Sequence, residues 1–229
     1  NINNLEWTKA ILLTAEECKE SNVNAINKGF CNLEKHIENI QKFGLQPVVC
    51  INAFPSDKQE EYDVLIELCA EKGVKAVVST AFADGGKGAE KLAQAIVEQV
   101  ATASANYQPL YLNTASIESK IETIATTIYG ADEVVYSALA NKQLQSIKEL
   151  GFEHFSICMV KTPASFSDDE KMIGRPTGFT VTVREFEFAS GAGFIIPLLG
   201  DVMRMPGLPK LPNATRIDID DNGVISGLS

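Results

Sequence analysis

The stretch PVVCINAFPSDKQEEYDVLIELCAEKGVKAVVST, residues 47–80, decides the fold of this chain. It opens with a continuously apolar segment over residues 47–52, which is typical of a strand covered on both faces. A helix follows, which is predicted to begin at a capping box of Ser56 and Gln59 and to end at Gly73. The predicted inner face of this helix comprises Tyr62, Leu65, Ile66 and Cys69. A second apolar strand over residues 74–80 completes a strand–helix–strand unit, which predicts a parallel sheet with right-handed crossovers.

Helical periodicity marks the segments on both sides of this unit. Residues 8–20 and 24–43 have helical patterns, and Gly44 stands where a left-handed C-cap belongs. The segment AFADGGKG, residues 81–88, is predicted to be a loop that leads into a further helix, and residues 101–113 are predicted to be a linker. The predicted buried stripes are Leu33, Ile37 and Ile40 on the helix over 24–43, and Leu92, Ile96, Val97 and Val100 on the helix after the loop.

The second half of the chain has a different order of predicted helices and strands. It carries two helices, a short apolar strand over 155–160, a polar loop over 161–178, and strands near 179–188 and 191–200. The helix stripes are Ile117, Ile121, Ile124 and Ile128, then Leu144, Ile147 and Leu150. The apolar phase slips by one residue at Arg184–Glu185, which predicts a β-bulge. Residues 216–228 predict a hairpin turning at Asp221, Asn222 and Gly223. The predicted fold class is α/β: a parallel-sheet βαβα portion over 1–108, then a smaller α+β region over 109–229.

Composition limits the function classes. The 229 residues carry a formal net charge of −10 and a pI near 4.8, which argues against a nucleic-acid or anionic-membrane surface. No apolar run approaches the roughly 20 residues of a membrane span, and no signal peptide opens the chain, so a cytoplasmic protein is expected. The start at Asn1 instead of a methionine suggests a portion of something longer. The cysteines fit neither a zinc site nor a CxxC pair, so reduced thiols in core packing are expected: Cys18, Cys31, Cys50, Cys69 and Cys158.

Two loops at the ends of the predicted parallel strands contain the candidate site, since ligands of open parallel sheets bind beyond the carboxyl ends of the strands. The first carries Asn52, Phe54, Pro55 and Asp57, and the second carries Phe82, Asp84, Gly85, Gly86, Lys87 and Gly88. If the strands are neighbours, Phe54 and Phe82 project into one crevice and clamp a planar heterocycle. The alternative, which the residue pattern alone favours, is that both rings only cover the strand ends.

Other candidate chemistry is weaker. DGGKG, residues 84–88, invites a phosphate-loop interpretation, but the spacing GxxxxGK(S/T) is absent from the chain, and a flexible turn entering a helix is the simpler interpretation. His36 on a helix, expected to be exposed, and His154 before a strand form no nucleophilic arrangement with Ser, Cys or Asp. Asp168 and Asp169 have oxygens for a cation, although a solvated loop explains them better, so no metal site is predicted.

Several long motifs resemble the C-terminal part of the formate–tetrahydrofolate ligases. They are CNLEKHIENIQKFGLQPVVCINAFPSD (31–57), GGKGAEKLAQAI (85–96), IYGADEV (128–134), GFEHFSICMVKTPASFSDDEKMIGRPTGF (151–179), GAGFIIPLLGDVMRMPGLP (191–209) and IDIDDNGVISGL (217–228). They are collinear and run from about residue 29 to the end. The resemblance implies a ligase of one-carbon metabolism in which formate attacks the γ-phosphate of ATP and the formyl group then passes to N10 of tetrahydrofolate. It also implies part of a P-loop NTPase-like domain, with magnesium, a monovalent cation as a further option, and a homo-oligomer at full length.

The resemblance assigns roles to the two strand-end loops. Phe54, with Asn52 and Pro55 beside it, corresponds to one aromatic wall of the pterin site. Phe82 stands where the family usually has a tryptophan, before Gly85, Gly86 and Lys87, so altered folate binding is expected. Lys161, Arg175 and residues 191–193 are possible nucleotide contacts.

A larger departure concerns the nucleotide. Because the family's P-loop is absent from this sequence, the chain alone is expected to lack ligase activity. The expected partner of the chain is the missing half that carries the P-loop. Two alternatives stay open. The chain is a non-catalytic folate- or pterin-binding module, or it is an interaction subunit that supplies this half to a separate P-loop polypeptide.

Overall fold

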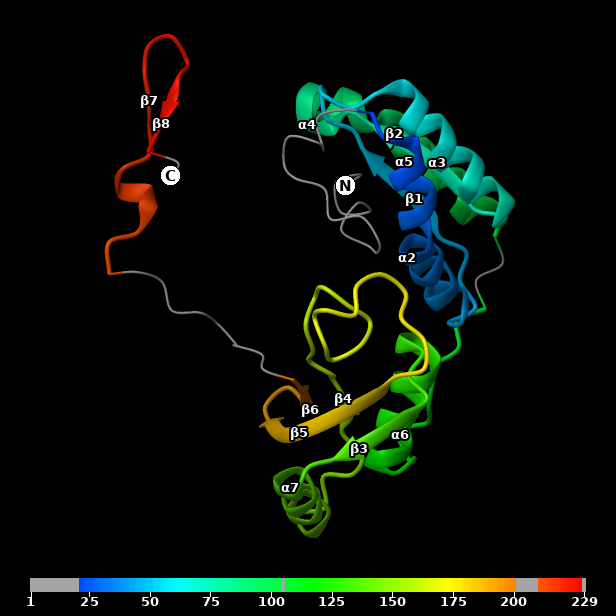
Figure 1. Ribbon diagram of the computed structural model, residues 1–229, viewed down its shortest axis with the longest axis vertical. Coiled ribbons are helices and arrows are strands. Elements are labelled where there is room, and N and C mark those ends of the chain that lie inside the picture. Colours follow the sequence, from blue (N-terminus) through cyan, green and yellow to red (C-terminus); the bar gives the residue numbers. More distant parts are fainter. Residues whose placement is uncertain (1–20, 104–105, 201–209, 228–229) are drawn as a thin grey trace.

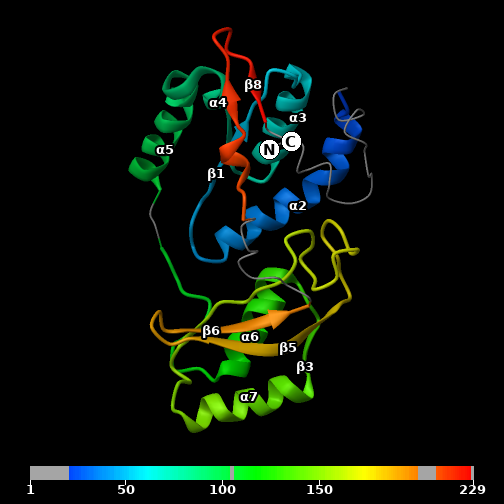
Figure 2. The same ribbon diagram turned by 90° about the vertical axis from the view of Figure 1, so that its left-hand side faces the viewer.

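A computed structural model describes residues 21–103, 106–200 and 210–227 of the chain (Figure 1). The helix expected over residues 8–20, and Cys18 with it, lies outside the described residues. Two sheets, each with helices packed on it, form separate hydrophobic cores, and a small hairpin lies apart from both (Figures 1 and 2). The architecture is therefore mixed α/β, with one parallel sheet and one mixed sheet.

The first core surrounds a two-stranded parallel sheet. Its elements in chain order are α2 (Val23–Gln41), β1 (Val48–Asn52), α3 (Gln59–Glu71), β2 (Lys75–Ser79), a single helical turn α4 (Ala81–Asp84), a 3-10 segment (Gly85–Ala89) and α5 (Glu90–Thr102). The strands β1 and β2 pair in parallel, from Val48 opposite Lys75 to Asn52 opposite Ser79, which confirms the predicted strand–helix–strand unit. The core is made by Ile26, Phe30, Ile37, Ile51, Ala53, Tyr62, Leu65, Cys69 and Val74.

The start of α3 differs from the prediction. The helix begins at Gln59, and Ser56 lies in a turn that is closed by the Asp57 N–H donating to the Phe54 carbonyl at 3.0 Å. The Glu61 carboxylate accepts from the backbone N–H of Lys58 at 3.2 Å, a helix-start contact that reaches back to the N-cap. The Ser56–Gln59 capping box is therefore wrong, because the turn after Pro55 uses Ser56 before the helix starts. The C-terminal end follows the prediction, with Gly73 at φ +69°.

Burial in this unit is lower than the apolar pattern predicts. Of the expected α5 stripe, Leu92 is half-buried and Ile96, Val97 and Val100 are 46%, 68% and 77% exposed. In β1 only Ile51 is fully buried, and Cys50 is exposed. A two-stranded sheet is too narrow to cover whole helix faces, so apolar periodicity alone overestimates the core here.

Several individual burial predictions are also wrong. Ile40, Ile66 and Leu150 are 42%, 36% and 67% exposed. The four described cysteines are free thiols, and only Cys69 packs in a core: Cys31 is half-buried, and Cys50 and Cys158 are exposed. Burial raises the pKa of the Cys69 thiol to about 11, so this side chain behaves as a small apolar group.

The second core surrounds a four-stranded mixed sheet of order β3-β5-β6-β4. Its elements are α6 (Ile117–Ile124), a π-helical turn (Ala125–Tyr129), β3 (Glu133–Tyr136), α7 (Ala138–Glu149), β4 (Ser156–Ile157), β5 (Thr180–Ala189) and β6 (Phe194–Leu199). The pairs β3–β5 and β4–β6 are parallel, and β5–β6 is antiparallel. The register shift between Val183 and Glu185 confirms the predicted bulge. Strand β3 was not predicted, and the strand expected over 155–160 is shortened to β4 and an isolated bridge between Val160 and Leu198.

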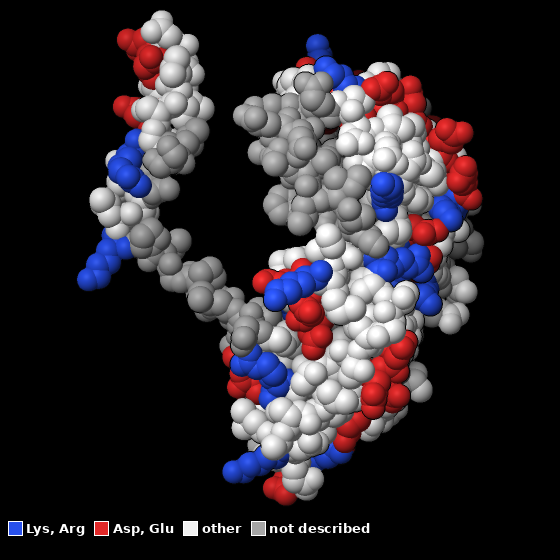
Figure 3. Space-filling model, viewed as in Figure 1, with Lys and Arg blue, Asp and Glu red and all other residues white. Residues whose placement is uncertain are grey.

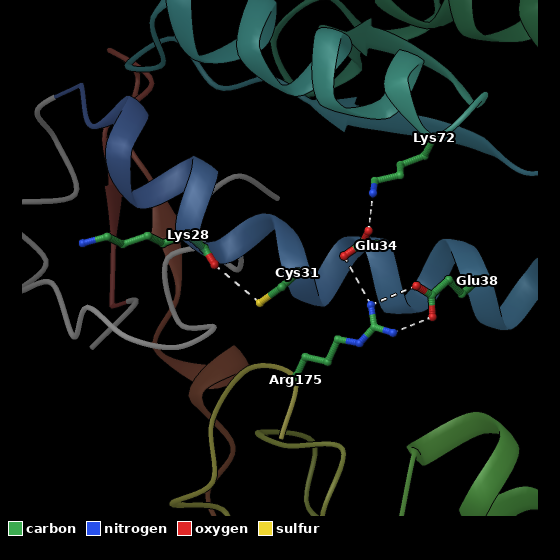
Figure 4. A network of polar contacts seen from close by, with 6 residues as sticks. All are labelled: Lys28, Cys31, Glu34, Glu38, Lys72 and Arg175. Carbon is green, nitrogen blue, oxygen red and sulfur yellow. Dashed lines mark hydrogen bonds and ion pairs between the residues drawn. The ribbon is translucent and has the colours of Figure 1, made fainter. Parts of the chain in front are cut away.

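Helix α2 connects the two cores through polar side chains. Figure 4 shows Arg175, on the long loop 161–178, reaching Glu34 and Glu38 of α2, while Lys72 at the end of α3 approaches Glu34 from the other side. The guanidinium meets both Glu38 oxygens at 2.9 and 2.7 Å, a bidentate pair. Lys35, also on α2 and buried, donates from Nζ to the Thr127 carbonyl in the π-helical turn at 3.1 Å. As predicted, loop 161–178 contains no helix or strand.

The outer surface and the C-terminal end follow the sequence more closely. Acidic side chains gather over α3 in Figure 3, where Glu60, Asp63, Glu67 and Glu71 are exposed. The hairpin of β7 (Asp218–Ile219) and β8 (Ile225–Ser226) confirms the predicted terminal turn, with Gly223 at φ +80°. Within the part of the chain that the structure describes, no helix has the length and apolarity needed to cross a membrane.

Candidate functional site

Phe54 and Phe82 meet beyond the carboxyl ends of β1 and β2. Their ring centroids lie 4.9 Å apart with the ring planes inclined by 52°. Since the strands are hydrogen-bonded neighbours that end at Asn52 and Ser79, the two loops leave the sheet side by side. The structure therefore brings together the two aromatic residues that the sequence placed on separate loops.

Phe54 is held by two side chains that bind its backbone. Asp57 Oδ2 accepts from the Phe54 N–H at 2.8 Å, and the Tyr62 hydroxyl donates to the same carboxylate oxygen at 3.3 Å. The Tyr62 hydroxyl also lies 3.5 Å from the Phe54 carbonyl. Burial and the adjacent Asp57 raise the pKa of Tyr62 to about 12, so the phenol keeps its proton and stays a donor near neutral pH. Tyr62 and Asp57 thereby position the loop that carries the Phe54 ring.

Phe82 is held by a close approach of two backbone segments. The segment 81–88, predicted to be a loop, forms the helical turn α4 and a 3-10 turn. The Thr80 N–H donates to the Gly88 carbonyl at 3.1 Å, and the Thr80 hydroxyl donates to Asp84 Oδ2 at 2.6 Å. A Cβ at Gly88 would lie 2.4 Å from the carbonyl carbon of Thr80, so only glycine fits there without a shift.

The ring pair is open on one side. Phe82 is 68% exposed and Phe54 is half-buried, so Phe82 is the more accessible wall. A planar guest between two parallel ring faces needs them about 7 Å apart, twice the carbon–carbon contact distance of about 3.5 Å. At 4.9 Å and 52° the rings contact each other, and an exposed Phe82 side chain has the freedom to turn aside for such a guest. The geometry can hold a planar heterocycle after a side-chain rotation.

The other predicted site residues lie around this pair. Asn52 is half-buried at the last position of β1, and Pro55 is exposed at the turn after Phe54. Gly85, Gly86 and Lys87 are exposed in the 3-10 turn that leads into α5, with Gly85 at φ +58°. These exposed residues make a polar rim beside the rings.

The residues considered as nucleotide contacts lie elsewhere. Arg175 is paired with α2, as described above, and residues 191–193 form the turn between β5 and β6. Lys161 donates from Nζ to the carbonyls of Thr162 and Ser165. Its ammonium also lies 5.1 Å from the Tyr129 ring centroid. None of these side chains contacts Phe54 or Phe82 among the contacts of the described residues.

The histidines and the acidic pair also have ordinary surroundings. His36 is exposed, as predicted, and its ring packs 4.9 Å from that of Phe166. His154 Nδ1 lies 3.2 Å from the Gly151 carbonyl. Asp168 Oδ2 accepts from the Thr182 N–H at 2.8 Å, which gives this carboxylate a structural contact. Over residues 21–103, 106–200 and 210–227 no group of three or more His, Cys, Asp or Glu side chains is arranged to hold a metal ion.

Sequence reasoning missed the positioning residues. Tyr62 fitted the apolar stripe of α3, and its hydroxyl partner is invisible in that stripe. Asp57 was named in the first loop, but its contact with the Phe54 N–H was not predicted. Gly88 was named in the loop but not among the site residues.

A comparison with known families supplies the context for this geometry. The model of the family described as formate–tetrahydrofolate ligase matches residues 4–229, and so includes residues 4–28, which the quoted motifs do not cover. The chain belongs to the formate–tetrahydrofolate ligase family. Membership confirms the resemblance seen in the sequence. It places the chain among ligases of one-carbon metabolism whose substrates are formate, ATP and tetrahydrofolate.

Proposed function

We propose that this chain supplies the folate-binding side of a formate–tetrahydrofolate ligase and that the pterin ring of tetrahydrofolate binds between Phe54 and Phe82. One observation carries this proposal: in a chain of this family, two aromatic rings from neighbouring loops lie 4.9 Å apart at the carboxyl ends of parallel strands. Ligands of open parallel sheets bind at this edge, and aromatic faces stack on planar heterocycles. Asn52, Pro55, Gly85, Gly86 and Lys87 form the rim of the proposed site.

The reaction assigned to the complete ligase needs little covalent help from the protein. A formate oxygen attacks the γ-phosphorus of ATP and ADP leaves, giving formyl phosphate. N10 of tetrahydrofolate then attacks the formyl carbon, inorganic phosphate leaves, and N10 loses its proton. Such a sequence depends on positioning and on charge stabilisation.

The phosphate-binding part of the proposed enzyme lies on other sequence. GxxxxGK(S/T) is absent from this sequence, and among the described residues no group of three or more His, Cys, Asp or Glu is arranged to hold a metal ion. We therefore assign ATP, magnesium and a monovalent cation to a P-loop half that joins this chain in a cytoplasmic, homo-oligomeric enzyme. The part of the P-loop NTPase-like domain present here is the βαβα portion over 1–108, and the α+β region is 109–229. The expected result is that the chain alone has no ligase turnover.

Tetrahydrofolate binding to the 229-residue chain tests the site, measured by anaerobic isothermal titration calorimetry. Phe54→Ala and Phe82→Ala each remove one ring face, and the loss of about 1–2 kcal/mol of stacking and burial weakens binding roughly 5- to 30-fold. Phe82→Trp enlarges the face and should tighten binding. Phe194→Ala is the matched control, because Phe194 is 40% exposed on β6 of the other sheet. Equal affinity for tetrahydrofolate in the wild-type chain and both alanine variants would rule out pterin binding between Phe54 and Phe82.

A turnover assay with formate, ATP, magnesium and tetrahydrofolate tests whether the ATP site lies on a polypeptide segment other than this chain. Absence of product from this chain, together with product after addition of a polypeptide that carries GxxxxGK(S/T), is the expected outcome. Tetrahydrofolate binding without turnover in either mixture would favour a non-catalytic folate-binding module. Robust product from the chain alone would refute the assignment of ATP to other sequence.

A further inference from the structure

A cavity lies away from the ring pair, on the side of the chain that leads into β1. It has a volume of about 580 Å³ and is walled by the C-terminal half of α2, the segment 107–113, the π-helical turn and β4. A smaller chamber of about 200 Å³ adjoins it and shares His36, Asn39, Ile128 and Tyr129 as lining residues. The larger volume is in the range of small-molecule sites, about 300–1,000 Å³.

A close backbone contact brings together two aromatic residues that line this cavity. Gly44, three residues after the end of α2 at Gln41, has φ +73°, and a Cβ there would lie 1.9 Å from the carbonyl oxygen of Asn106. The Gln108 N–H donates to the Phe43 carbonyl at 3.0 Å, which fixes Tyr107 beside Phe43. Their rings are parallel within 3° and their centroids are 6.1 Å apart. The absence of a Cβ at Gly44 therefore allows two parallel aromatic rings to line the cavity.

The larger cavity has mainly apolar walls. Its lining includes Ile40, Phe43, Ile124, Ile128, Ile157 and Met159. Among its described lining residues, the polar side chains are uncharged ones and His36. The charged group of the smaller chamber is an ammonium, that of Lys161. The two chambers have no carboxylate among their described lining residues, so they disfavour cations.

Lys161 carries a half-buried ammonium whose hydrogen-bond partners are backbone carbonyls. It bonds two carbonyls, leaving one of its three N–H groups for another acceptor, and no carboxylate forms an ion pair with it among the described residues. Desolvation lowers the pKa of Lys161 to about 8, and Asp168 opposes this shift only in part. A buried charge is costly until it is paired, so an anion that reaches this chamber would gain from meeting it.

An amide at the junction of the chambers points to the same conclusion. Asn39 is 8% exposed and lines both chambers. Its Oδ1 has no hydrogen-bond partner within the described structure, and neither has Oδ1 of Asn32 in the smaller chamber. A half-rotation of the Asn39 amide exchanges its oxygen and nitrogen, which lets it donate to a ligand oxygen.

We infer that this cavity binds a small aromatic carboxylic acid, with its ring among the apolar walls and its carboxylate directed at Lys161 and Asn39. The inference does not rest on the proposed folate site, because the two loops that carry Phe54 and Phe82 contribute no residue to the described lining of the cavity. The carboxylate would accept the third N–H of Lys161. The parallel rings of Phe43 and Tyr107 would cover the outer end of the ligand.

Calorimetric titration of the 229-residue chain with 2-naphthoate tests this inference. Saturable one-to-one binding is expected, with weaker binding of the neutral 2-naphthamide and of the non-aromatic octanoate. Lys161→Met should weaken 2-naphthoate binding about 10- to 100-fold, the value of a hydrogen bond to a charged group. Lys171→Met is the matched control, because Lys171 is an exposed lysine on the same loop and lines neither chamber. Its affinity should match that of the wild-type chain.

Two further measurements keep the test decisive if Lys161→Met fails to fold. Ile40→Trp fills the cavity from a position that is already 42% exposed on α2, so the fold should survive while binding is lost. In the wild-type chain, affinity should fall, approaching tenfold per pH unit, as the pH rises above the pKa of Lys161 in the ligand-free chain, about 8. Equal binding of naphthoate and naphthamide, retained binding in Ile40→Trp, a flat pH profile or no saturable binding of naphthoate would each overturn the inference.

Discussion

Alanine substitutions at Gly88 and Gly86, two residues apart in one turn, should have opposite consequences. At Gly88 a Cβ would lie 2.4 Å from the carbonyl carbon of Thr80 and 2.6 Å from the nitrogen of Ala81. Both are backbone atoms, so the contact is relieved only by moving one segment away from the other by about 1 Å. At Gly86 a Cβ meets nothing within 4 Å, and φ lies outside the left-handed region.

The magnitudes follow from these contacts. Gly88→Ala combines overpacking of about 1–3 kcal/mol with the weakening of the Thr80–Gly88 hydrogen bond, worth about 1 kcal/mol, for a total loss of about 2–4 kcal/mol. Gly86→Ala restricts the unfolded chain and should be neutral or stabilising by up to about 1 kcal/mol. Because the displaced segment carries Phe82, Gly88→Ala should also weaken tetrahydrofolate binding, whereas Gly86→Ala should not.

Urea unfolding followed by circular dichroism measures the first effect, and calorimetric titration with tetrahydrofolate measures the second. Equal stability of the two variants would refute the close approach of residues 80 and 88. A Gly88→Ala chain that is destabilised but binds tetrahydrofolate like the wild-type chain would separate the turn from the proposed site. In that case the position of Phe82 would not depend on this backbone contact.

Three further substitutions probe other contacts. Lys120→Met should cost about 2–4 kcal/mol of unfolding free energy, because the fully buried Lys120 ammonium donates to the carbonyls of residues 153 and 155 at 2.7 and 3.0 Å. Lys142→Met is the control, because Lys142 is exposed. Equal urea midpoints of the two variants would contradict this role of Lys120. Arg175→Lys replaces a partly exposed bidentate pair and should cost only about 0.5–1 kcal/mol, so a loss above about 2 kcal/mol would show a larger role. Tyr62→Phe should reduce the loss of stability at alkaline pH. In the wild-type chain the folded state raises the pKa of the Tyr62 phenol from 10 to about 12. The protonated phenol therefore stabilises the fold below pH 10, and this contribution is lost as the pH rises from 10 to 12. Identical alkaline profiles of Tyr62→Phe and the wild-type chain would contradict the third prediction.

Local sequence determined the elements whose signals lie within a few residues. The apolar runs and the glycines at helix ends specified the parallel unit of β1, α3 and β2, and the slip in alternation specified the bulge after Val183. The turn of the terminal hairpin was also visible in the sequence. The strand-end positions of Phe54 and Phe82, together with long collinear motifs, were sufficient to indicate both the family and the candidate site.

Tertiary structure decided which of these side chains are buried and which partners they meet. The apolar stripe of α5 is largely exposed and Arg175 pairs with α2, because burial and ion pairing depend on segments far apart in the chain. The hydroxyl of Tyr62 and the missing Cβ of Gly88 acquire their roles only when another backbone segment approaches them. The cavity beside Lys161 is likewise formed by segments that are separated by more than 100 residues in places, which no local period encodes.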